Sequence, residues 1–122
     1  MKTGYDSFED LIVWQEAMKL CVDVYREFNA CKDFGLRNQI QRSAISVPSN
    51  IAEGFERHTD KEFIRFLYMA KGSSGELRTQ LLIAVSVSAI QHELGHGLIE
   101  RAKKISAMLQ KLIDARKRNG KR

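Results

Sequence analysis

Apolar residues in this chain recur every three or four positions, and this helical period is the feature that most constrains its fold. Between residues 11 and 28 the row consists of Leu11, Trp14, Met18, Cys21, Tyr25 and Phe28. A second row, between residues 63 and 84, consists of Phe63, Leu67, Ala70, Ser74, Leu77, Leu81 and Ala84. Such spacing places residues on one face of an α-helix. The chain shows no alternating strand pattern, so the sequence predicts an all-α protein.

Breaks in this pattern predict four helices. The first is expected to end near residue 28, before the polar segment 29–35, and the second to cover about 36–55. The third follows the break at 58–60, and the fourth is expected over about 89–118. Asp6 and Ser7 can cap the first helix, and Thr59 or Asp60 can cap the third with support from Glu62. Ser88 and Gln91 have the form of a capping box at the start of the fourth helix. Short connections between four helices predict an up-and-down four-helix bundle.

The length and the N-terminal segment indicate a single soluble domain. A chain of 122 residues can form one domain, 1–122, with its own core. Its longest nearly uncharged apolar run, LLIAVSVSAI at 81–90, is about half as long as a bilayer span. The first ten residues, MKTGYDSFED, carry acids where a signal peptide is apolar, so we expect a cytoplasmic protein. Cys21 and Cys31 are too far apart along a helix for a disulfide and are expected to be reduced.

The first predicted helix is apolar on two faces. Besides the row from Leu11 to Phe28, this helix has another apolar row roughly 100° further around its axis. This other row consists of Val13, Ala17, Leu20 and Val24. One face can pack into the bundle of its own chain. The other face is therefore expected to contact a partner.

Basic residues are concentrated at the C-terminal end of the chain. Residues 1–110 contain 14 basic and 14 acidic side chains, so the net charge of +5 comes from residues 111–122. The basic side chains of this segment are Lys111, Arg116, Lys117, Arg118, Lys121 and Arg122, against the single acid Asp114. A basic tail of this kind suits the phosphate backbone of a nucleic acid, because each neutralised phosphate releases a counterion. The alternative is that these cations complement the dipole of the last helix and keep the protein soluble.

The segment HELGH, residues 92–96, matches the zinc-peptidase signature H-E-x-x-H. The apolar stripe of the last helix consists of Leu94, Leu98, Ala102, Ile105, Leu109 and Leu112, and both histidines fall on the opposite side. A third ligand at the expected spacing is missing. We therefore predict that HELGH is helical, exposed and dispensable for the core, and expect no catalytic residue, no metal site and no cofactor. Adventitious metal binding by His92, His96 and Glu100 stays open.

The second predicted helix contains the only proline of the chain, Pro48. A proline inside a helix removes one backbone hydrogen bond and crowds the preceding turn. Side chains that can satisfy the freed carbonyl groups are those of Ser46, Ser49 and Asn50. The small residues of KGSSGE, 71–76, allow a neighbouring helix to approach the third helix closely. Both features predict a helix kink fitted to a close contact between helices, with a ligand site as the alternative.

The same region carries a resemblance to a known family. Gln39, Ile40 and Arg42, the string SVPSNIAEGF at 46–55, and the later residues Arg57, Phe63, Phe66, Leu67, Ala70, Gly72, Ser73, Glu76 and Leu77 resemble the proteins encoded by intervening sequences of bacterial 23S rRNA genes. The resemblance implies a four-helix bundle. It also implies a relation to the accessory protein of diversity-generating retroelements, whose homopentameric barrel is associated with nucleic-acid binding. A ring-like homopentamer is thus expected here, which would cover the second face of the first helix.

The family has no known catalytic residues to transfer to this chain. The matching residues Arg42, Pro48, Ser49, Asn50, Glu53, Gly54 and Phe55 are interpreted as structural. We further expect Arg42, Glu53 and Glu76 to form a partly buried polar network, because buried charges need partners. The sequence thus predicts a non-enzymatic homo-oligomer that binds RNA or a nucleoprotein through its basic surface. The alternatives are a protein-interaction scaffold without nucleic acid and a zinc metallopeptidase.

Overall fold

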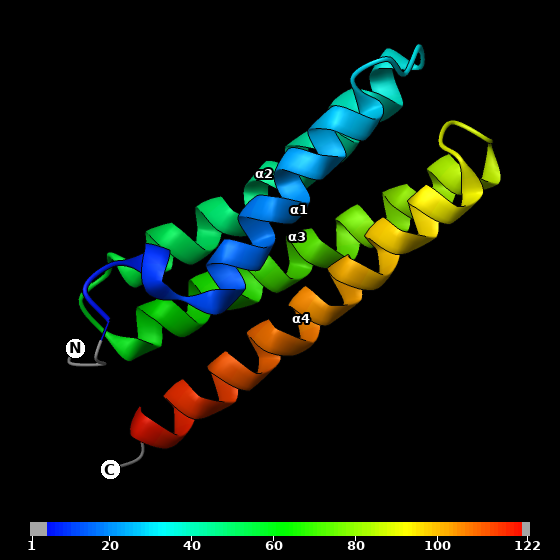
Figure 1. Cartoon of the computed structure of the whole chain (residues 1–122). Coiled ribbons are helices and arrows are strands. Elements are labelled where there is room, and N and C mark those ends of the chain that lie inside the picture. Colours follow the sequence, from blue (N-terminus) through cyan, green and yellow to red (C-terminus); the bar gives the residue numbers. More distant parts are fainter. Residues whose placement is uncertain (1–4, 121–122) are drawn as a thin grey trace.

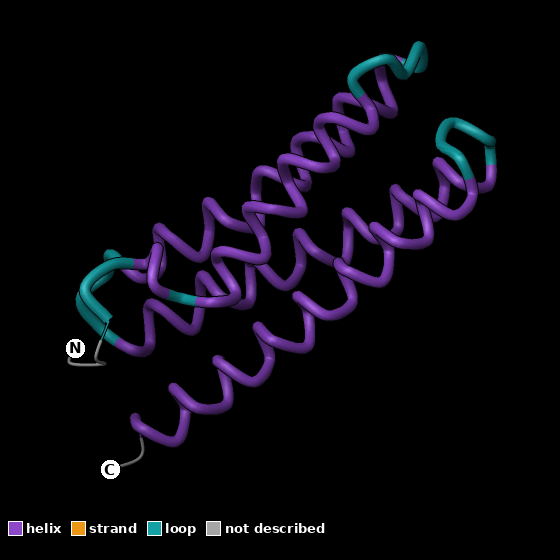
Figure 2. The backbone as a smooth tube through the Cα atoms, in the orientation of Figure 1, coloured by secondary structure: helices purple, strands orange, loops and turns teal. Residues whose placement is uncertain are grey.

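Four long helices account for most of the chain in the computed structural model, which describes residues 5–120. A short 3-10 turn, η1 (Phe8–Asp10), precedes α1 (Ile12–Phe28), α2 (Phe34–Phe55), α3 (Asp60–Ser86) and α4 (His92–Gly120). Successive helices run in opposite directions, and the described part contains helices and loops only (Figures 1 and 2). The prediction of an all-α four-helix bundle is confirmed.

Side-chain caps begin both α2 and α3, and only the cap of α3 is one that the sequence predicted. Asp33 accepts a hydrogen bond from the Leu36 amide, so α2 begins at Phe34, slightly earlier than expected. Thr59 accepts a hydrogen bond from the Glu62 amide at 3.1 Å and caps α3 as predicted. Ser7 instead caps the turn η1, and α1 begins after Leu11.

The predicted start of α4 at residue 89 is wrong, because Ser88 terminates α3. Ser88 has φ 60°, in the left-handed region, whereas a residue that caps a helix start is extended. The Ser88 amide donates to the Val85 carbonyl at 3.1 Å, and the Ala89 amide donates to the Ala84 carbonyl at 2.8 Å. This pair of bonds is the Schellman motif that ends helices. The chain therefore leaves α3 at Ser88 and enters α4 at His92.

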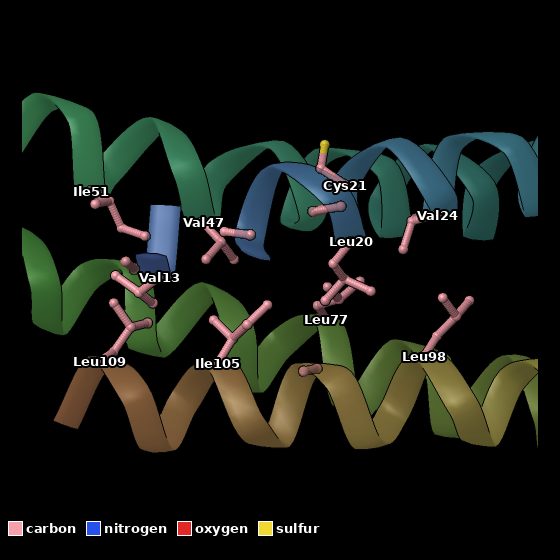
Figure 3. Close-up of a cluster of buried hydrophobic side chains, with 14 of the residues drawn as sticks. Val13, Leu20, Cys21, Val24, Val47, Ile51, Leu77, Leu98, Ile105 and Leu109 are labelled. Atoms are coloured by element: carbon pink, nitrogen blue, oxygen red, sulfur yellow. The ribbon is translucent and has the colours of Figure 1, made fainter. Parts of the chain in front are cut away.

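The core lies between all four helices (Figure 3). The row predicted on α3 is buried along its whole length, from Phe63 to Ala84. α3 makes its largest contacts with α2 and α4, whereas the contact between α1 and α4 is small. α3 is therefore the central helix of the packing.

The face of α1 that enters the core differs from the expected one. The buried side chains of this helix are Val13, Ala17, Leu20, Cys21, Val24 and Phe28, which include the whole row that was expected to contact a partner. Met18 and Tyr25 of the other row are exposed, as are Ile12 and Val22. The helix does leave apolar side chains exposed, but they are a different set from the predicted one.

The contact between α2 and α3 is close at Gly54. A Cβ atom at this position would lie 2.6 Å from Phe66 Cβ and 3.0 Å from a ring carbon of Phe63.

Pro48 lies inside α2 and is buried. Asn50 donates to the Ser46 carbonyl at 2.9 Å, and the Ser46 hydroxyl lies 2.8 Å from that of Ser73 on α3. The polar residues near the proline thus link the two helices.

Serines rather than glycines make the close contact on the other side of α3. The buried Ser74 hydroxyl donates to the Ala102 carbonyl at 3.0 Å and accepts from Ser106 at 2.9 Å, both on α4. Gly72 and Gly75 have open space where a Cβ would lie, so KGSSGE fulfils its predicted role only through its serines.

The buried stripe of α4 also differs from the predicted one. It contains Leu98, Ile99, Ala102, Ile105, Leu109 and Ile113. Leu94 is exposed and Leu112 is only partly buried, whereas Ile99 and Ile113, which were not predicted, are buried. Among residues 5–120 no helix combines the length and apolar composition needed to cross a bilayer. Cys21 and Cys31 are free thiols, and burial raises the pKa of Cys21.

Candidate nucleic-acid interface

Most of the predicted basic tail is the end of a helix. α4 continues to Gly120, so Lys111, Arg116, Lys117 and Arg118 have fixed positions relative to the bundle. Lys121 and Arg122 lie outside the described residues. The helix packs beside α3 here, and its surface is therefore shaped by both helices.

Arg116 is not part of a free basic surface, which corrects its predicted role. Its side chain is only 5% exposed, and it donates to the Asp60 carboxylate at 3.2 Å. Its guanidinium also lies 5.1 Å from the centre of the Phe63 ring. Asp60 is the first residue of α3, where the helix dipole also favours a carboxylate. Arg116 therefore joins the end of α4 to the start of α3.

Lys117 is exposed and forms a hydrogen bond across the α3–α4 contact. Its Nζ donates to the Tyr68 hydroxyl at 2.7 Å. This hydrogen bond lowers the pKa of Tyr68 below its ordinary value and raises the pKa of Lys117. One turn further along α3, Lys71 Nζ donates to Gln110 Oε1 at 2.6 Å. The two lysines are thus held on the same surface as Tyr68.

The outward side of α4 carries a straight row of cations that was not predicted from the sequence. Lys104, Lys111 and Arg118 are all exposed and are spaced by seven residues. Seven residues are close to two helical turns, so the three side chains share one face and span roughly 21 Å. We call these three residues the outer row. The spacing of seven was the signal in the sequence, and it extends the basic surface to Lys104, beyond the predicted segment 111–122.

Few acids offset these charges. Between residues 101 and 118, α4 carries seven basic side chains and the single acid Asp114. Three of the seven pair with acids elsewhere: Arg101 with Asp23 at 2.7 Å, Lys103 with Glu100 at 3.7 Å and Arg116 with Asp60. Gln110 donates to Asp114 at 3.0 Å, and Asp114 is exposed one turn from Lys111 and Arg118. Lys103 is also exposed, next to the outer row. The second half of α4 is therefore strongly positive on its solvent side, which attracts polyanions.

The start of α3 is bordered by arginines that pack on aromatic rings. Arg57 and Arg65 lie 4.7 Å and 4.6 Å from the centre of the Phe66 ring. Arg57 also pairs with Glu53 at 2.9 Å, and Arg65 with Glu62 at 3.1 Å. The hydrogen bond from Arg65 lowers the pKa of Glu62. Their charges are thus partly compensated, in contrast to the outer row.

The residues of the SVPSNIAEGF segment divide between the interior and the surface. Pro48 and Gly54 are buried, and Asn50 and Phe55 are partly buried. The predicted network of Arg42, Glu53 and Glu76 is wrong for the single chain, because all three side chains are exposed. Helix geometry places Arg42 and Glu53 on the outer side of α2, where they face solvent rather than a neighbouring helix.

Comparison with protein families identifies the chain. The model of the 23S rRNA-intervening sequence proteins matches residues 9–111, which include all of α1, α2 and α3 and most of α4. The chain belongs to the 23S rRNA-intervening sequence protein family. The family resemblance noted from the sequence is therefore confirmed. A comparison with curated proteins gave no match.

A solved structure supports the fold of this intervening sequence protein. It is the crystal structure of a protein with unknown function from the S23 ribosomal protein family of Bacteroides thetaiotaomicron VPI-5482. The two chains are 24% identical and superpose with a TM-score of 0.79, over 84% of this chain and 98% of the other. The similarity confirms the four-helix architecture. Neither this structure nor the family model indicates an enzyme.

HELGH in this family member is a helical surface segment, as predicted for its histidines. His92 and His96 are exposed, and their ring centres lie 4.4 Å apart. Within residues 5–120 no group of three or more histidine, cysteine or acidic side chains is placed to hold a metal ion. Gly95 is an exception to the predicted dispensability, because it is buried and a Cβ there would collide with Val85 Cγ2. The glycine of the motif is needed for packing.

Proposed function

We propose that this intervening sequence protein is a non-enzymatic RNA-binding protein that contacts RNA, alone or within a nucleoprotein, through the outer row of α4. The observation that carries the proposal is the row itself. Lys104, Lys111 and Arg118 project from one rigid helix face, and Asp114 is the only acid between residues 101 and 118. A fixed line of exposed cations suits a phosphate backbone, because charge is presented without the entropy cost of ordering a tail.

The test is a titration of RNA binding against salt. In the triple variant Lys104→Gln, Lys111→Gln and Arg118→Gln, three phosphate contacts are removed from the proposed interface. Each lost contact reduces the slope of log affinity against log salt by roughly 0.7 for single-stranded RNA, so a decrease of about 2 is expected. We expect the affinity at low salt to fall more than tenfold.

A matched control separates the location of charge from the total charge. Lys19, Arg26 and Lys32 are exposed on or just after α1, and their replacement by glutamine changes the net charge by the same amount. This control variant is expected to bind RNA nearly as well as the wild type. Equal losses in the two triple variants would show a non-specific effect of charge, and unchanged binding in the first would refute the interface.

We also propose that copies of the chain assemble into a homo-oligomeric ring, of five subunits as the family resemblance implies. The support is the outer face of α2, where Arg42, Ile45, Ser49 and Glu53 are all exposed within a sector of about 80°. Arg42, Ser49 and Glu53 are among the residues that carry the family resemblance, yet the side chain of each is exposed. A second copy of the chain packed on this face would bury them.

Light scattering tests the assembly directly. A pentamer is expected to have about five times the 14.0 kDa mass of the chain. Ile45→Asp places a charge on the proposed contact and is expected to yield smaller species, whereas Leu94→Asp changes an exposed leucine on another helix and serves as control. A monomeric wild-type protein would refute the ring without affecting the proposed RNA surface.

A further inference from the structure

Tyr68 is an exposed aromatic side chain in the middle of a basic surface. It is 42% exposed on α3, beside the last turns of α4. Lys117 contacts its hydroxyl, while Arg65 and Lys71 lie one turn before and one turn after it on α3. Tyr68 thus combines an accessible ring with neighbouring cations, the two features that single-stranded nucleic acids require of a binding surface.

The ring of Tyr68 is not covered by the cation that contacts it. Lys117 Nζ lies 2.7 Å from the hydroxyl oxygen but 5.2 Å from the ring centre. These distances place the ammonium group beyond the hydroxyl edge, away from the ring faces. Phe66 differs, because Arg57 and Arg65 both pack on it and only 4% of it is exposed. Tyr68 therefore retains ring surface that a flat ligand can contact.

The lysines beside Tyr68 are held in place but keep donors for a ligand. An ammonium group has three N–H donors. Lys71 uses one for Gln110 Oε1, and Lys117 uses one for the Tyr68 hydroxyl. Both lysines can therefore donate to a phosphate group without giving up these contacts. The hydrogen bonds also fix the distance between the cations and the ring.

We propose that Tyr68 stacks on an unpaired base and that Lys71 and Lys117 contact the flanking phosphates, so that the protein prefers single-stranded RNA. The inference rests on the proposed RNA-binding function and specifies its substrate. In duplex RNA the faces of the bases are stacked on one another and are not accessible to a side chain. Stacking on an aromatic ring tolerates any base sequence, because every base has a π face. The preference is therefore for strandedness rather than sequence.

The experiment compares an unstructured adenine-rich RNA with a duplex RNA of the same length. Tyr68→Ala is expected to weaken binding of the single strand about tenfold or more and to change duplex binding less than about twofold. Tyr68→Phe keeps the ring and is expected to retain most single-strand binding. Tyr25→Ala removes a similarly exposed tyrosine from α1 and is expected to bind both RNAs as the wild type does.

The outcomes separate this inference from the proposed function. Wild-type single-strand binding by Tyr68→Ala, or equal losses for single strand and duplex, would overturn the stacking role. The same loss in Tyr68→Phe would show that the hydroxyl rather than the ring is required, and would also overturn it. In each of these cases the outer-row variant still reports whether α4 binds RNA. If the wild type binds neither RNA, both proposals fail.

Discussion

Replacing Gly54 by alanine is expected to destabilise the protein, although alanine is the better helix former. The added Cβ would lie 2.6 Å from Phe66 Cβ, 3.0 Å from a ring carbon of Phe63 and 3.3 Å from the Phe63 carbonyl oxygen. The first of these atoms is attached directly to the backbone of α3. It cannot move away by a change of rotamer, so α2 and α3 must separate.

The size of the effect follows from two opposing terms. Carbon atoms pack best at about 3.5–4.0 Å, so the contact is too short by about 1 Å. Overpacking of a core typically costs about 1–3 kcal/mol, and a contact with a Cβ atom belongs to the upper part of that range. Alanine regains about 1 kcal/mol of helix propensity over glycine. The free energy of unfolding is therefore expected to fall by about 2 kcal/mol.

Two other helical glycines provide the same substitution without the collision. Gly72 on α3 and Gly97 on α4 have no atom within 4 Å of an added Cβ. Gly72→Ala and Gly97→Ala are expected to raise the free energy of unfolding by up to about 1 kcal/mol. Urea denaturation followed by circular dichroism, at one protein concentration, measures all three variants. A Gly54→Ala variant as stable as the two controls would refute the close packing of α2 on α3.

Alanine substitutions at three consecutive positions of α4 test its contacts with α3. Arg116→Ala leaves Asp60 without its buried partner and is expected to lower the free energy of unfolding by about 3 kcal/mol. Arg118→Ala is expected to change the free energy of unfolding by less than about 0.5 kcal/mol. Urea denaturation measures both variants. Similar stabilities would contradict the burial of Arg116. Lys117→Ala is expected to raise the pKa of Tyr68 toward its ordinary value, because the hydrogen bond that stabilises the phenolate is lost. The absorbance of the phenolate, followed against pH, measures this pKa. An unchanged titration, as expected for Arg118→Ala, would show that this contact is absent in solution.

The proposed RNA-binding surface was only partly predictable from the sequence. The concentration of positive charge near the C-terminus is visible in the composition. The roles of adjacent residues are not, since Arg116 is buried against α3 while Lys117 and Arg118 are exposed. Tyr68 belongs to a different helix, about 49 positions away from Lys117, and no local pattern links the two. Long-range side-chain contacts of this kind depend on how the helices pack.

The sequence by itself determined the number of helices, most of their bounds and the buried face of α3, because the 3.6-residue period and the capping residues act within a few positions of the chain. It also determined the family, through the segment at 46–55. Only the tertiary structure decided which apolar row of α1 enters the core and that Ser88 ends α3. It alone decided that Gly54 meets Phe66 and that Arg116 pairs with Asp60. These features depend on the rotation and distance of one helix relative to another, which arise from close packing of many side chains at once.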